Sequence, residues 1–235
     1  MTEWNLPLKL ELKDPRQVRS FVTRQGRLTK GQRAALEALW PRFGLDAAKD
    51  DITKVGQPEQ PRVLEIGFGN GDSLAQMGEN YPDTLFFGVE VHQPGVGAIL
   101  QSIEEKGIEN IHLFYADARD VLAQAIPDGS LDRVQVYFPD PWPKKRHHKR
   151  RIIQTAFVEN ILPKLKQGGL FHCATDWEPY AEHMLEVLSG IDALENTSTT
   201  GGAMEARPEF RPETKFERRG QNLGHGVWDF VFRKK

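Results

Sequence analysis

The chain has 235 residues, a formal net charge of −2 and a single cysteine. This length suits one α/β domain, alone or with an appendage, and allows a core large enough to fold without disulfide bonds. The near-neutral charge excludes a general polycation, so any binding of nucleic acid has to come from local basic patches. The lone Cys173, the absence of a signal-like segment in residues 1–13 and the absence of an apolar run of about 18 residues predict a cytoplasmic protein without membrane contact.

The first part of the chain differs in composition from the rest. Residues 16–33 carry six Lys and Arg and no acid, which is typical either of an arm that contacts phosphates or of a solvated face. We expect a basic, partly ordered amino-terminal extension over residues 1–50 and one main domain over residues 51–235. Within the extension, Thr29 and Gln32 have the spacing of a capping box and predict the start of a helix.

Beyond this extension, expected strands alternate with expected helices. A polar segment punctuated by Gly and Pro, residues 46–61, is typical of a linker. Short apolar runs then predict strands, and runs with helical spacing predict helices. The strands cover residues 63–66, 85–91, 111–115, 131–138, 170–174 and 227–232, and the helices cover residues 73–79, 95–106, 119–125, 152–166 and 179–188. We expect Gly168 and Gly169 to end the fourth helix. This alternation implies a mostly parallel sheet with helices on both faces, which binds ligands at the carboxyl ends of its strands.

A glycine-rich turn follows the first of these strands. Its glycines fall as G-x-G-x-G in the segment Glu65-Ile66-Gly67-Phe68-Gly69-Asn70-Gly71, and glycines let the backbone approach a ligand closely. Glu90 ends the next strand, where a carboxylate can accept hydrogen bonds from ribose hydroxyls. Asp117 ends the third strand, where it can meet an adenine edge. The loop lacks the Lys-Ser/Thr of a phosphate-binding loop, and its spacing differs from that of nicotinamide dehydrogenases.

This glycine loop, with one acid at the end of each of the next two strands, resembles the class I S-adenosylmethionine (SAM) methyltransferases. The resemblance implies a Rossmann-like α/β fold with a mostly parallel, seven-stranded sheet and helices on both faces. It also implies SAM as the cofactor. SAM carries a sulfonium cation and no phosphate, so carboxylates suit it. The implied cofactor-binding residues are Glu65, Gly67, Gly69, Gly71, Glu90, Asp117, Ala118 and Asp140.

A proline-rich turn closes the fourth strand and runs into a basic block. The turn is Phe138-Pro139-Asp140-Pro141-Trp142-Pro143, and the basic block, residues 144–151, holds six Lys or Arg and two His. A carboxylate beside an aromatic ring can hold a flat base, and a dense positive run can hold phosphates. This combination predicts an enzyme that acts on a base within a structured nucleic acid. The alternatives are an ordinary stiffened turn, a solvated face and, for Trp142, a buried anchor in place of a stacking platform.

Two further segments place polar groups near the same edge of the sheet. Asp176 follows the fifth strand, where it can bind a ligand or cap the next helix. Thr214 and Glu217 belong to a polar tail and can hydrogen-bond a purine edge or form part of a solvated loop.

Together these segments resemble the bacterial tRNA (guanine-N7-)-methyltransferase family. The matching stretches are Arg19-Ser20-Phe21-Val22, Gly26-Arg27-Leu28-Thr29, the glycine loop, Pro139-Asp140-Pro141-Trp142-Pro143-Lys144, Thr175-Asp176 and the pattern R-P-x-T-x-F-E-x-x-G from Arg211 to Gly220. The resemblance implies an enzyme that forms N7-methylguanosine in tRNA, at position 46 of the variable loop.

The same resemblance assigns roles to individual residues. Asp140 is implied as the catalytic residue. The implied substrate-binding residues are Lys144, Asp176, Thr214, Lys215, Phe216 and Glu217, and the implied RNA-binding residues are Arg146, His147, His148, Lys149, Arg150 and Arg151. No Cys/His set has the spacing of a zinc site, so we expect no metal. We expect a monomer or a weak homodimer.

Two other functions stay open at this point. A SAM-dependent enzyme of this fold can instead methylate another RNA or DNA base, although such enzymes often carry an Asn/Asp-Pro-Pro-aromatic turn that differs from the order found here. A non-catalytic RNA-binding protein can also use a methyltransferase scaffold. The complete glycine loop and its acids argue against that alternative.

Overall fold

The computed structural model describes residues 18–21, 26–214, 217 and 226–235. Within them eight strands form one sheet in the order β1-β4-β3-β2-β5-β6-β8-β7. Their bounds are β1 Gly44–Leu45, β2 Arg62–Ile66, β3 Leu85–Glu90, β4 Ile111–Tyr115, β5 Leu131–Tyr137, β6 Leu165–Thr175, β7 Leu194–Asn196 and β8 Trp228–Lys234. Strands β1 to β6 pair in parallel, whereas β8 runs antiparallel to β6 and β7. The expected α/β class is confirmed, with the two-residue edge strand β1 bringing the expected seven strands to eight.

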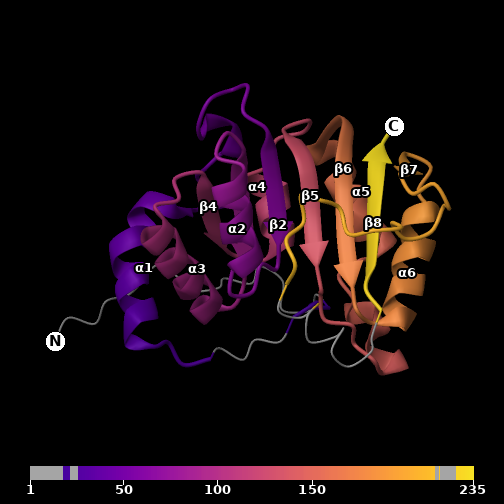
Figure 1. The fold of residues 1–235 in the computed structure, drawn as a ribbon, viewed down its shortest axis with the longest axis horizontal. Helices are drawn as coiled ribbons and strands as arrows, with labels where there is room; N and C mark the ends of the chain where they lie inside the picture. The colour runs from indigo at the N-terminus through magenta and orange to yellow at the C-terminus, as the bar shows by residue number, and fades with distance from the viewer. Residues whose placement is uncertain (1–17, 22–25, 215–216, 218–225) are drawn as a thin grey trace.

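Helices cover both faces of this sheet. The α-helices of the described residues are α1 Lys30–Phe43, α2 Asp72–Asn80, α3 Gln93–Lys106, α4 Ala118–Gln124, α5 Thr155–Ile161 and α6 Glu178–Ser189, and the 3₁₀ turns are η1 Ile52–Lys54, η2 Lys145–Arg150 and η3 Leu162–Lys164. Figure 1 shows α1 at one end of the sheet and α6 at the other. One apolar core lies beneath α1, α2 and α3, and a second lies beneath α4, α5 and α6.

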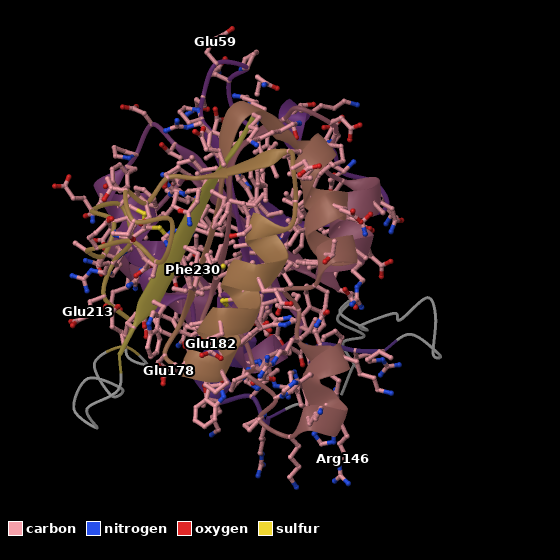
Figure 2. All side chains as sticks on the ribbon, turned by 90° about the vertical axis from the view of Figure 1, so that its right-hand side faces the viewer. Glu59, Arg146, Glu178, Glu182, Glu213 and Phe230 are labelled. Atoms are coloured by element: carbon pink, nitrogen blue, oxygen red, sulfur yellow. The ribbon has the colours of Figure 1, made fainter. Side chains whose placement is uncertain are left out.

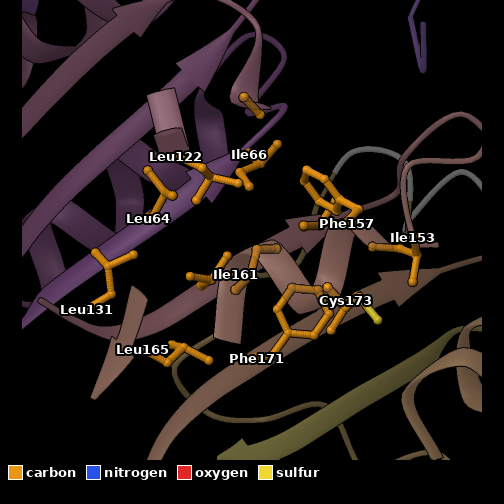
Figure 3. Packing of buried hydrophobic residues seen from close by; sticks show 14 of the residues in the cluster. Leu64, Ile66, Leu122, Leu131, Ile153, Phe157, Ile161, Leu165, Phe171 and Cys173 are labelled. Carbon is orange, nitrogen blue, oxygen red and sulfur yellow. The ribbon is translucent and has the colours of Figure 1, made fainter. Parts of the chain in front are cut away.

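The two cores follow from the two-residue period of the strands. Leu64 and Ile66 of β2 point into the second core, while Val63, the residue before Leu64, points into the first. Figure 3 shows the second core, where Phe157 of α5 packs close to the side chains of β6. Cys173 is one of these buried strand residues, as expected for a core position.

The helix expected over residues 152–166 is wrong in extent. The helix α5 ends at Ile161, and β6 already begins at Leu165. Pro163 explains the early end, because proline lacks the N–H that a continuing helix would use. Gly168 and Gly169 therefore lie inside a strand, and Gly168 has a φ of 74°, close to an irregularity in the pairing of β5 with β6.

Part of the amino-terminal extension is built into the domain. Thr29 caps α1, and its side chain and that of Gln32 form the reciprocal bonds of a capping box, as expected. A Cβ atom at Gly97 of α3 would lie 2.7 Å from Cβ of Gln32, so α1 and α3 touch closely. The segment expected to be a linker contributes Ile52, which is fully buried.

The chain order around β2 places the site. From β2 the chain runs outward through β3 and β4, and it then returns to the other side of β2 as β5. The strand order therefore reverses between β2 and β5, and loops at the carboxyl ends of these strands diverge. Such a switch point is where open α/β sheets bind ligands.

Candidate cofactor and acceptor site

A cavity of about 650 Å³ opens at the carboxyl ends of β2 to β5. It brings together every residue implied in cofactor binding, namely Glu65, Gly67, Gly69, Gly71, Glu90, Asp117, Ala118 and Asp140. It is also lined by Thr214 and by two residues of the amino-terminal extension, Ser20 and Phe21. The cavity therefore joins the glycine loop, the proline turn and the tail.

The glycine loop needs its glycines for two different reasons. Gly67 and Gly69 have φ values of 77° and 61°, and a Cβ atom at either would meet no atom within 4 Å. Their left-handed backbone leaves open space for a ligand to approach. Gly71 has a φ of 80°, and a Cβ there would lie 2.5 Å from Cβ of Ile99, so this glycine serves packing.

Glu90 is fixed by backbone donors at the end of β3. Its carboxylate accepts hydrogen bonds from the N–H groups of Gly69 at 2.8 Å, Val91 at 2.7 Å and His92 at 2.9 Å. Burial raises the pKa of Glu90, and these three bonds oppose the rise. Because a carboxylate offers about four acceptor sites, these bonds leave about one for a ligand hydroxyl.

Glu65 lies beneath the loop, and its side chain is buried in β2. Its Oε2 accepts a hydrogen bond from Nε2 of Gln135 on β5 at 2.7 Å. Burial raises the pKa of Glu65 to about 7, against the influence of Gln135 and Arg133. A cation that binds above it would favour the ionised carboxylate.

The proline turn is a strained platform. Phe138 and Trp142, on either side of its central residues, have φ values of 49° and 45°. A left-handed conformation costs a non-glycine residue about 1–2 kcal/mol, so the surrounding contacts must hold the turn. Asp140 lies between these two residues and lines the cavity. Loss of solvent around its carboxyl raises the pKa of Asp140, and the charge of Arg150 opposes the rise.

The turn and the basic block together clamp the amino-terminal extension over the cavity. The guanidinium of Arg150 lies 3.8 Å from the centre of the Trp142 ring. Arg150 donates hydrogen bonds to the carbonyl of Arg19 at 2.9 Å and to that of Phe21 at 2.8 Å, and Trp142 Nε1 donates to the carbonyl of Ser20 at 3.2 Å. One face of the Trp142 ring is therefore occupied by Arg150, which favours the anchor over the stacking platform.

The basic block divides into exposed and internal cations. Lys144, Lys145, Arg146 and Lys149 are exposed, and Figure 2 shows Arg146 projecting from the end of the molecule opposite Glu59. His147, His148 and Arg150 are half-buried. Arg151 is 3% exposed and donates to the carbonyls of Pro141 at 2.9 Å and Pro179 at 3.2 Å. Arg151 thus supports the proline turn from within, although the resemblance implies a contact with RNA.

The residues implied in substrate binding are only partly brought together. Thr214 lines the cavity, and Lys144 follows the proline turn. Asp176 follows β6 and lies outside α6, whose cap position is taken by Trp177. Glu217 is buried and ion-pairs with Arg211 at 2.6 Å. Lys215 and Phe216 lie outside the described residues.

Sequence reasoning missed two groups at this site. Ser20 and Phe21 were recognised only as part of a family pattern, and nothing in the local sequence says that they cover a cavity. The buried charges around Arg211 were also missed, although an arginine next to a T-x-x-E pattern is a usable signal. In the described part of the chain, no cluster of His, Cys, Asp and Glu has the arrangement of a metal site. No described helix is long and apolar enough to cross a bilayer.

Comparison with known proteins places this site in a family. The model of a family described as "Putative methyltransferase" matches residues 59–230. The tRNA (guanine-N(7)-)-methyltransferase of Aeromonas hydrophila is 56% identical over 221 residues, which cover 93% of each chain. The protein of the same name from Idiomarina loihiensis is 57% identical over 220 residues, covering 93% of this chain and 89% of the relative. The chain belongs to the tRNA (guanine-N7-)-methyltransferase family. This membership confirms the resemblance of its motifs.

Solved structures support the fold of the family. The 16S rRNA methyltransferase KamB matches with a TM-score of 0.54 at 15% identity, over 90% of this chain and 96% of that one. An rRNA methylase from Streptococcus thermophilus matches with a TM-score of 0.50 at 14% identity, over 89% and 99% of the two chains. At such identities the likeness extends to the fold alone, which is the class I methyltransferase fold.

Proposed function

We propose that this protein transfers the methyl group of SAM to N7 of a guanine in tRNA, in the variable loop at position 46. One observation carries the proposal. A single cavity joins a glycine loop with three carboxylates to Asp140 and Thr214, in a chain 56% identical to a tRNA (guanine-N(7)-)-methyltransferase over most of its length.

The cavity fits SAM as the cofactor. Gly67 and Gly69 leave room that a side chain would fill, and Glu90 keeps an acceptor site for a ribose hydroxyl. Asp117 and Ala118 line the part of the cavity at the end of β4. Glu65 offers a carboxylate that suits the positive charge of a bound SAM. When bound, SAM supplies an electrophilic methyl group on a sulfonium.

The acceptor atom decides what Asp140 has to do. Guanine N7 has a free lone pair and no proton, so methyl transfer needs no general base. Asp140 instead orients the guanine by accepting hydrogen bonds from the N1–H and N2–H₂ groups of the base, or stabilises the positive charge that develops on the guanine ring. Thr214 adds a hydroxyl on another side of the cavity. Holding N7 in line with the methyl carbon and sulfur then supplies most of the rate.

The exposed cations of the basic block bind the phosphates of tRNA. Four of them are exposed, Lys144, Lys145, Arg146 and Lys149. If each neutralises one phosphate, the slope of log affinity against log salt is about −3, at about −0.7 to −0.9 per contact. His147, His148 and Arg150 lie along the same turn and extend this surface toward the cavity. With tRNA as the partner, we place the protein in the cytoplasm.

The test is to identify the product. The protein is incubated with methyl-labelled SAM and unmodified tRNA, and the tRNA is digested to nucleosides. We expect label in N7-methylguanosine, and its loss when the variable-loop guanosine is replaced by adenosine. Label in another nucleoside, or no transfer at all, refutes the proposal. Sedimentation of the same sample tests the prediction of a monomer or weak homodimer.

A further inference from the structure

A buried arginine stands at the centre of a charged cluster behind the cavity. The side chain of Arg211 is 0% exposed. Its Nε and Nη2 donate to the two carboxylate oxygens of Asp229 on β8, at 2.6 and 2.7 Å. Its Nη1 and Nη2 donate to the two carboxylate oxygens of Glu217, at 2.6 and 3.2 Å. Such double pairing fixes the plane of the guanidinium.

The carboxylate of Glu217 is fully used by groups of the protein. Besides Arg211, the N–H of Thr214 donates to its Oε2 at 3.4 Å, and Arg207 donates to its Oε1 at 3.3 Å. These four donors match the roughly four acceptor sites of a carboxylate. The N1–H or N2–H₂ of a guanine would have to displace one of these donors.

Thr214 and Glu217 form a reciprocal pair. The N–H of Glu217 donates to Oγ1 of Thr214 at 3.1 Å, while the N–H of Thr214 donates back to the Glu217 carboxylate. This is the bonding pattern of a capping box. It fixes the backbone of Thr214, the residue of this pair that lines the cavity.

Arg211 also lies near two aromatic rings at the end of β5, where the chain enters the proline turn. Its guanidinium lies 5.8 Å from the ring centre of Tyr137 and 5.7 Å from that of Phe138. Phe138 is the residue with a left-handed backbone just before Pro139 and Asp140. One side chain therefore pairs with Glu217 of the tail and lies close to the start of the proline turn.

The charged cluster is also bonded to side chains of the sheet. Nε2 of His172 on β6 is hydrogen-bonded to Oδ1 of Asp229 at 2.7 Å, and its Nδ1 is hydrogen-bonded to the Tyr137 hydroxyl on β5 at 2.9 Å. Burial alone would raise the pKa of Asp229, but the bonds from His172 and Arg211 outweigh it and lower this pKa. The cluster thus spans three neighbouring strands, and the carboxyl of Asp229 within it is held ionised.

We propose that Arg211 and Glu217 are positioning residues of the acceptor site. Arg211 fixes Thr214 and the turn of Asp140 relative to each other, and Glu217 acts through Arg211 and Thr214 without touching the base. This inference rests on the proposed function, because it takes the acceptor to be a guanine. It replaces the direct substrate contact that the family resemblance implies for Glu217.

The experiment compares Glu217→Gln with the wild-type protein on two tRNAs, one with guanosine and one with inosine at the acceptor position. Inosine lacks the 2-amino group, so a carboxylate that contacts this edge loses a partner. We expect kcat/KM to fall about tenfold or more with Glu217→Gln on both tRNAs alike, since the two changes are independent. The Kd for SAM should stay within about threefold. A loss that disappears with inosine, or no loss at all, overturns the proposal.

A second comparison tests whether the two residues act as one unit. Arg211→Lys keeps the charge but loses the double pairing. The double variant with Glu217→Gln should be no slower than the slower single variant, because both break the same link. If the losses of kcat/KM in the two single variants multiply in the double variant, the shared role is overturned.

Controls separate positioning from folding and from the proposed function. Arg207→Gln is the matched control, because Arg207 is half-exposed and its removal leaves the Arg211 pairs intact; we expect kcat/KM within about threefold of wild type. If Arg211→Lys does not fold, as judged by its thermal transition, the inosine comparison decides alone. The product formed by the wild-type protein tests the proposed function. The comparison of the single and double variants tests the positioning role.

Discussion

Removing the charge of Glu65 should stabilise the protein at high pH and leave it unchanged at low pH. Glu65 is 3% exposed, and burial raises its pKa from 4.5 to about 7. The folded chain therefore holds this proton at pH values where the unfolded chain has lost it. Stability falls as the pH rises from about 4.5 to about 7 and then levels off. At about 1.4 kcal/mol per pKa unit, the penalty above pH 7 is about 3 kcal/mol.

Urea unfolding of Glu65→Gln and wild type, without SAM and at several pH values from about 5 to about 8, measures this penalty. Glutamine keeps an oxygen to accept the hydrogen bond from Gln135. We expect a gap of less than about 1 kcal/mol near pH 5 and a gap of about 3 kcal/mol in favour of the variant near pH 8. Glu105→Gln, an exposed site on α3, is the control and should show no gap that grows with pH. A gap of constant size across the range refutes the reasoning.

Three further predictions concern the acceptor, the clamp and the basic block. Asp140→Asn should keep the Kd for SAM within about threefold and lower kcat/KM about 100-fold or more, as for loss of one preorganised electrostatic group; near-normal turnover would contradict the assignment. Trp142→Leu removes the ring on which Arg150 lies and should release the clamp on Arg19, Ser20 and Phe21. Dissociation of SAM, followed by stopped flow, should then become about tenfold faster, equivalent to about 1.4 kcal/mol, and an unchanged rate would argue against a covering role. Lys145→Gln and Lys149→Gln should each make the salt slope of tRNA binding shallower by about 0.7 to 0.9, and a slope equal to that of wild type would remove that lysine from the phosphate contacts.

The strands and the cofactor loop could be predicted because their signals are local. β3 is buried along its whole length and appears in the sequence as one apolar run that ends in Glu90. The glycines of the loop are required by its own backbone conformation. Acids at the ends of neighbouring parallel strands then meet at one edge without any further information. Residues 162–166 could not be assigned in this way, because Leu162 and Leu165 fit the helical spacing as well as a strand, and only Pro163 marks the end of the helix.

Which cations of the basic block bond to the protein and which stay exposed could not be predicted. In the sequence its cations are neighbours, and each is an equal candidate for a phosphate contact. In the structure Arg150 bonds to the carbonyl of Arg19, 131 residues earlier, and Arg151 bonds to the carbonyl of Pro179, 28 residues later. These partners are set by tertiary packing, so the spacing of charges along the chain says nothing about them. The exposed cations stay candidates for the phosphate contacts that the charge run predicts.

Glu217 shows where the sequence held more information than the family pattern conveyed. A family pattern presents Thr214 to Glu217 as one unit, which suggests one common role toward the substrate. The spacing T-x-x-E is also that of a capping box, the same signal that correctly predicted the start of α1 at Thr29. Applied to the tail, it predicts that the glutamate turns back to the backbone of Thr214, as observed. A carboxylate that is bonded to a backbone N–H and to a buried arginine supports the cavity-lining Thr214. Of this short pattern, Thr214 therefore lines the cavity, and Glu217 holds the backbone of Thr214 in place.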